Sequence, residues 1–125
     1  MSATLVALGD LGVDVADVEQ LGALYDSQLG EWGVGGEHFG LDPNPTINLI
    51  GIGLGEHLVR RCGLRWVVAT DEQGAEIAVH GAPGDVLIYP TNVVAKRWVA
   101  RERGFLPGFA DQIAQRVEEI RRAGS

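Results

Sequence analysis

The stretch GLRWVVATDEQGAEIAVHGAPGDVLIYP, residues 63–90, decides the fold. It holds three short apolar runs, LRWVVAT from Leu64, EIAVH from Glu76 and DVLIY from Asp85, separated by the turn sequences DEQG and GAPG. Runs of this length, bounded by glycine and proline, are typical of strands. Because such short loops join neighbouring strands that run in opposite directions, the sequence predicts a three-stranded antiparallel meander.

Helical patterns lie on both sides of this stretch. Before it, apolar residues at spacings of three and four predict one helix after Asp14 and another from Thr46 to Gly63. Between them, the glycine- and proline-rich segment 30–45 is expected to form one long loop. After Pro90, two more helices are predicted. Their expected apolar positions, with Thr91 or Asn92 as the cap of the earlier helix, are Val94, Ala95, Trp98 and Val99, then Phe109, Ile113, Val117 and Ile120.

The order of these elements predicts an α+β fold: two helices, a three-stranded antiparallel meander and two helices, with the helices mainly on one face of the sheet. Alternate residues of a strand face one side, so one face of the meander should share a core with the helix before it. The residues expected in that core are Trp66, Val68, Ile77, Val79 and Leu87 of the sheet, and Ile50, Leu54 and Leu58 of the helix.

Length and composition indicate a single domain, residues 1–125, of ordinary globular character. Hydrophobic residues make up 46% and charged residues 22% of the chain. No apolar run approaches the length of a membrane span, and the first residues lack the pattern of a secretion signal. Cys62 is the only cysteine, which excludes a disulfide within the chain. We therefore expect a cytoplasmic protein without membrane contact, and nine arginines against one lysine suggest a bacterial, GC-rich genome.

The chain is acidic, and its charges are segregated. The formal net charge is -7; residues 1–45 hold eight acidic and no basic side chains, whereas residues 85–125 hold five acidic and seven basic ones. We expect the acidic segment to lie near the basic segment 96–103, either in the same chain or across a dimer. Exposed ion pairs contribute little to stability, so such an arrangement would act mainly on orientation and on the choice of partner.

The sequence motifs that could indicate a cofactor, a metal ion or a nucleophile are each incomplete. GIGLGE, residues 51–56, resembles the start of a dinucleotide fingerprint but has Glu56 where the third glycine belongs. The histidines, His38, His57 and His80, show no metal-ligand spacing. Cys62 is expected at a helix C-terminus, where the helix dipole opposes a thiolate. We expect no cofactor and no metal.

Four residues remain as candidates for binding or as buried polar groups. Glu56 falls opposite the Leu54 and Leu58 stripe, on a helix expected to be covered on both sides, so its carboxylate would need a partner. Asp71 is predicted in a hairpin turn with Gly74. Lys96 and Arg97 belong to a basic cluster around Trp98, but the acidity of the chain argues against nucleic-acid binding.

The string GIGLGEHLVRRCGLRWVVATDEQGAEIAVHG and the later DVLIYPTNVVAKRW resemble the bacterial family known as domain of unknown function 3806, over residues 47–98. The resemblance is carried by the helix with Gly55 and Glu56, by the strand from Trp66 to Asp71, and by the strand that ends at Pro90. It implies the same order of elements. It brings no activity, cofactor or catalytic residue, and it leaves the acidic first 45 residues outside.

Three functions stay open. The first is a non-catalytic binding or interaction domain, with a protein partner or self-association. The second is an immunity or antitoxin-like protein that blocks a basic partner, which suits a small acidic domain. The third is a small enzyme that uses Glu56, and it requires a concave pocket around that residue. The absence of a surviving catalytic motif favours the first.

Overall fold

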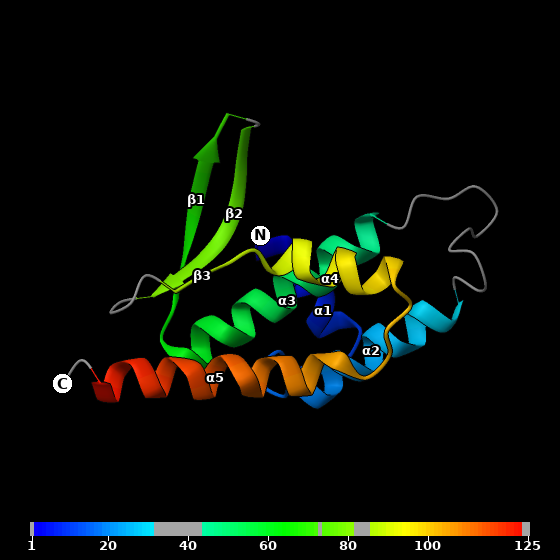
Figure 1. Ribbon diagram of the computed structural model, residues 1–125. Helices are drawn as coiled ribbons and strands as arrows, with labels where there is room; N and C mark the ends of the chain where they lie inside the picture. Colours follow the sequence, from blue (N-terminus) through cyan, green and yellow to red (C-terminus); the bar gives the residue numbers. More distant parts are fainter. Residues whose placement is uncertain (1, 32–43, 73, 82–85, 124–125) are drawn as a thin grey trace.

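The computed structural model describes residues 2–31, 44–72, 74–81 and 86–123 (Figure 1). The elements in chain order are α1 (Ser2–Asp10), α2 (Val18–Glu31), α3 (Asn44–Cys62), β1 (Arg65–Asp71), β2 (Gly74–Gly81), β3 (Val86–Ile88), α4 (Pro90–Val99) and α5 (Phe105–Ala123). The sheet has the order β1-β2-β3 with both pairs antiparallel, so the α+β class and the meander are confirmed.

Among the described residues, three helices precede the sheet where the sequence predicted two. The additional one is α1, whose apolar residues do not gather in one stripe: Leu8 is fully buried while Val6 is exposed. The expected loop 30–45 is also shorter at both ends, because α2 continues to Glu31 and α3 begins at Asn44. Residues 32–43 lie outside the described residues.

The cap of α2 is Asp17 and not Asp14. The Asp17 Oδ1 atom accepts a hydrogen bond of 3.1 Å from the Glu19 backbone, which is the geometry of an N-cap carboxylate. Asp14 instead closes a turn before the helix, where its Oδ1 accepts the Ala16 N–H at 3.0 Å. The apolar residues whose three- and four-residue spacing predicted this helix are buried: Val15, Val18, Leu21, Tyr25 and Leu29.

Helix α3 lies at the centre of the molecule and touches α1, α2, α4, α5 and the sheet (Figure 1). At three of its glycines, atoms of other elements occupy the space that a side chain would need. A Cβ atom would come within 2.6 Å of the Thr91 Cα at Gly51 and within 2.9 Å of the Leu21 side chain at Gly53, and it would overlap the Trp66 ring at Gly55. The GIGLG sequence is therefore a packing motif.

The sheet packs on α3 through the face that carries Trp66, Val79 and Ile88, and the core prediction is correct for most residues. It is wrong for Leu87, which is 45% exposed, because the register pairs Leu87 with His80 and turns Ile88 inward. It is also wrong for Val68, which is 67% exposed, and Ile77 is only partly buried and does not belong to the core cluster. The distal half of the β1–β2 hairpin rises beyond the helices, so no helix covers it (Figure 1).

Both C-terminal helices exist as predicted, with changes at their starts. Tyr89 is the N-cap of α4 and makes no side-chain cap, so Thr91 and Asn92 do not have the predicted role. Pro90 is the first helical residue, where its fixed φ and missing N–H suit a helix start. In α5, Pro107 falls in the first turn, and the buried residues are Leu106, Ala110 and Val117. Phe109 and Ile113 of the predicted stripe are partly buried against the core.

We expect the Gly55→Ala substitution to destabilise the fold, because the new methyl group would overlap the Trp66 ring and the Pro90 ring. The loss in unfolding free energy should be about 1 to 3 kcal/mol, as for other overpacked sites. The matched control is Gly108→Ala in α5, where nothing lies within 4 Å of the added atom. That control should be neutral or stabilising by about 0.5 to 1 kcal/mol. Urea unfolding measures both, and equal stabilities of the two variants would contradict the packing role.

Candidate functional site

The Glu56 carboxylate lies between α3 and the start of β1 and has two partners in its own chain. Its Oε2 atom accepts the Arg60 Nε at 2.7 Å, and its Oε1 atom accepts the indole N–H of Trp66 at 3.0 Å. The Glu56 side chain is 15% exposed. Since both oxygens are bonded to neighbours, the carboxylate fixes the Trp66 ring over Gly55. This geometry is that of a structural carboxylate.

His57 is the buried polar side chain at the next position of α3, with 3% of its surface exposed. Its Nδ1 atom donates to the Val15 carbonyl at 2.7 Å, which fixes the Nδ1–H tautomer. The Nε2 atom is then the acceptor that faces the Arg61 guanidinium at 3.5 Å. Burial lowers the pKa of His57 below 6.5, and the Arg61 charge adds to this effect. The imidazole is therefore neutral at pH 7 and connects α3 to the segment before α2.

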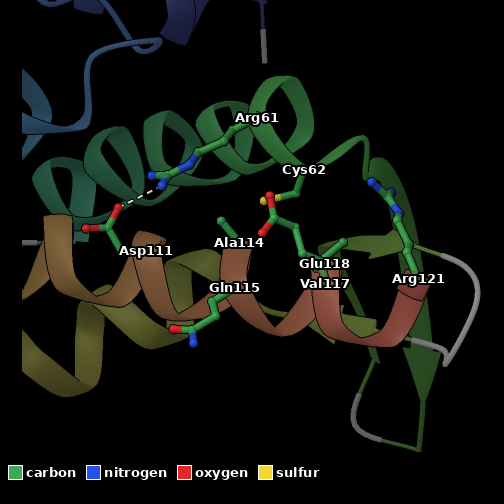
Figure 2. A pocket seen from close by; sticks show the side chains of 8 residues that line it. All are labelled: Arg61, Cys62, Asp111, Ala114, Gln115, Val117, Glu118 and Arg121. Carbon is green, nitrogen blue, oxygen red and sulfur yellow. Dashed lines mark hydrogen bonds and ion pairs between the residues drawn. The ribbon is translucent and has the colours of Figure 1, made fainter. Parts of the chain in front are cut away.

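Arg61 continues this chain of polar contacts to α5. Its Nη2 atom donates to the Asp111 carboxylate at 2.7 Å, as drawn in Figure 2. The two side chains are 37% and 65% exposed, so the pair lies at the surface and adds little stability by itself. The position of the pair is more informative than its contribution to stability, because the pair closes one end of a cleft between the last turn of α3 and the middle of α5.

That cleft has a volume of about 280 Å³, and its lining is mixed in charge (Figure 2). Its charged and polar lining residues are Arg61, Asp111, Gln115, Glu118 and Arg121, and Cys62 is the thiol among them. Burial raises the pKa of the Cys62 thiol, an effect that Arg61 and Arg121 oppose and Glu118 reinforces. A protonated, buried thiol is a poor nucleophile. The Nε2 atom of His57 accepts from Arg61, so this lone pair is engaged.

The histidines do not come together in the described part of the chain. His57 is engaged as above, His80 lies on β2, and His38 falls outside the described residues. Within residues 2–31, 44–72, 74–81 and 86–123, no three His, Cys, Asp or Glu side chains are arranged to hold a metal ion. Nor is any helix there long and apolar enough to cross a membrane.

The basic cluster at the end of α4 is used within the fold. Lys96 is exposed, whereas Arg97 pairs with Glu102 at 2.7 Å and lies 5.6 Å from the centre of the Phe105 ring. Arg101, at a positive φ of 58°, donates to the Leu29 carbonyl at 3.2 Å. These contacts hold the α4–α5 connection and do not form a free basic stripe.

The end of α2 contacts the α4–α5 connection through hydrogen bonds to backbone atoms, so these contacts do not pair an acidic with a basic side chain. Asp26 accepts the Gly104 backbone N–H at 2.8 Å, beside the contact of Arg101 with α2. Between them lies the fully buried Tyr25 ring, in edge contact with Trp98 and Phe105. Burial raises the pKa of Tyr25 to about 12, with Asp26 and Glu102 as lesser causes. The phenol stays neutral, and the cluster fastens α2 to α4 and α5.

Asp71 ends β1 and stands opposite Gly74 in the register, which confirms the predicted hairpin turn. Gly74 has a φ of +129°, a conformation that other residues rarely adopt. The structure thus separates the four residues singled out from the sequence: Glu56 beneath the sheet, Asp71 at the hairpin tip, and Lys96 and Arg97 on α4. It does not unite them in one site.

Sequence reasoning missed the polar residues that the fold does bring together. His57, Arg61 and Asp111 form one connected set, and Trp66 is the partner of Glu56. The separation of 50 residues between Arg61 and Asp111 leaves no local signal. The i, i+4 spacing of His57 and Arg61 on one helix is the only trace that a sequence could show.

The arrangement described so far is that of an α+β domain whose polar residues stabilise helix contacts. A family model described as Domain of unknown function (DUF3806) matches residues 41–105, which is more than half of the chain, and the chain belongs to this family. The expected resemblance is confirmed. A comparison with curated proteins gave no match, and neither did a comparison with solved structures.

The lowered pKa of His57 predicts how the stability of the fold depends on pH. A group whose pKa is lowered in the folded state favours folding above its unfolded pKa of about 6.5 and loses that contribution as the pH falls below it. The protein should therefore lose stability between pH 7.5 and 5.5 through protonation of His57. His57→Asn keeps a donor near the Val15 carbonyl but does not titrate, so this part of the loss should disappear. The measurement is urea unfolding at both pH values; equal pH dependence in the two proteins would refute the role of His57.

Proposed function

We propose that this protein is a non-catalytic binding domain and that its contact element is the distal part of the β1–β2 hairpin. The proposal is carried by one observation: the hairpin projects from the helical body (Figure 1), and among the described residues no strand outside β1, β2 and β3 pairs with it. On one side, β1 is the edge strand; on the other, β3 pairs only with residues 79–81 of β2. Unpaired strand edges are sites at which another chain adds a strand.

The surface of the hairpin supports this proposal. Val68 is 67% exposed at the middle of β1, and Ile77, its partner across the register, is only partly buried. Exposed apolar residues that occur singly are common on protein surfaces. Here the two are directly opposite on one face of a projecting element, which gives a partner an apolar pair to cover.

The polar residues elsewhere argue for binding and against the use of Glu56 in catalysis. Both oxygens of Glu56 are bonded to Arg60 and Trp66, and its helix neighbour His57 is held between a carbonyl and a guanidinium. The Cys62 thiol is kept protonated by burial. A general base or nucleophile needs a free lone pair near a place for substrate, and each of these groups is engaged or masked.

We expect a double variant of the hairpin, Val68→Asp/Ile77→Asp, to lose a partner protein that the wild-type chain binds. The matched control is Val6→Asp/Val99→Asp, which changes two exposed valines on helices, 63% and 81% exposed. The measurement is cross-linking in the native host, followed by reconstitution of the complex from purified proteins. If hairpin variant and control retain the same partners with the same affinity, the hairpin is not the contact element.

A basic partner, as for an immunity or antitoxin-like protein, is a second candidate. It is favoured by four exposed carboxylates around the start of α2, from Asp10, Asp14, Asp17 and Glu19. None of the ion pairs between described residues uses them. A complex of this kind should weaken steeply with salt, whereas strand addition should not, because backbone hydrogen bonds carry it. The affinity of the reconstituted complex between 50 mM and 500 mM salt, about a tenfold range, separates the two.

A further inference from the structure

We infer that the open edge of β1 binds the β1 edge of a second copy of this chain, antiparallel and centred on Val68. This inference rests on the proposed function, because it takes the hairpin as the contact element. It adds which chain binds at the β1 edge. The result would be a two-fold dimer with a continuous six-stranded sheet, β3-β2-β1 followed by the same strands of the partner in reverse.

The first argument is that this edge lacks the features that prevent pairing. Natural edge strands are protected by charged residues, proline, bulges or short length. Residues 66–70 of β1 are Trp, Val, Val, Ala and Thr, without charge, proline or glycine. The strand is seven residues long and pairs with β2 residue by residue without a bulge. Among the described residues, no segment pairs with its outer edge.

The second argument is the charge pattern of RWVVATD. In an antiparallel pair of β1 strands centred on Val68, Arg65 of one chain stands opposite Asp71 of the other, and the same holds at the other end. Opposite charges directly across two strands stabilise the pairing, whereas like charges oppose it. The strand is therefore complementary to itself in this one register, and a shift by one residue would break both pairs.

The third argument is the position of the apolar residues. Val68 would stand opposite its own copy on the two-fold axis, on the same face as Ile77 of each chain. The four side chains would form one apolar cluster at the point where the hairpin carries its exposed valine. The distal part of the hairpin rises beyond the helices, which leaves this part of β1 accessible to a second copy (Figure 1).

The test measures the mass of the full chain by sedimentation over a range of concentrations. We expect the wild-type mass to rise from 13.3 kDa toward twice that value. Val68→Lys places two ammonium groups opposite each other on the axis and should weaken dimerisation at least tenfold, by about 1.4 kcal/mol or more. Val99→Lys, at an 81% exposed position on α4, is the matched control and should dimerise as the wild type does.

The register is tested by a charge exchange. Arg65→Asp alone places two carboxylates opposite each other at both ends and should weaken the dimer, whereas the double variant Arg65→Asp/Asp71→Arg should restore it. Circular dichroism checks that each variant is folded. A monomer at every concentration, a dimer that Val68→Lys leaves intact, or a double variant no tighter than Arg65→Asp would overturn the inference. A monomer whose hairpin variants still lose an outside partner would leave the proposed function standing.

Discussion

The close approach of α3 to its neighbours is the constraint on which the rest of the structure depends. Gly51 lets the α4 backbone come against α3, Gly53 admits the leucines of α1 and α2, and Gly55 admits the Trp66 ring. Because α1, α2, α4 and β1 approach one helix at these glycines, a side chain at any of the three positions would displace a neighbouring element. Glycine weakens a helix by about 1 kcal/mol at each position, and the burial of Ile50, Leu54 and Leu58 on the same helix offsets that cost.

Polar side chains of α3 then hold in place the elements that the glycines allow to approach this helix. Glu56 bonds to the indole of Trp66 and thereby orients the first strand on α3, while His57 ties the same helix to the segment before α2. The buried imidazole is compatible with this place because it is neutral and both of its nitrogens have partners. Buried polar groups stabilise a unique arrangement only when all of their hydrogen bonds are made. These residues therefore serve the architecture first.

The hairpin is the part that this architecture leaves uncovered. Its base packs on α3 through Trp66 and Val79, and its tip extends past the end of the helical layer. A strand edge exposed in this way promotes association unless it is protected, and β1 has no charge between its two ends. The polar contacts of α3 hold the base of the hairpin in place. The distal part of the hairpin then presents the surface that we propose for binding.

The sequence by itself determined the α+β class, the meander, four of the five helices that the described residues form, and the burial of Ile50, Leu54 and Leu58, because these follow from local periodicity and turn residues. It also identified Glu56 as a carboxylate that needs a partner. Only the tertiary structure decided that Ile88 and not Leu87 faces the core, because the register across a loop is a property of two strands and their turn. Only the tertiary structure, likewise, decided that Val68 is exposed, that Trp66 is the partner of Glu56, and that Arg61 meets Asp111. Those contacts join residues far apart in the chain, and no local pattern records which distant side chain will lie within reach.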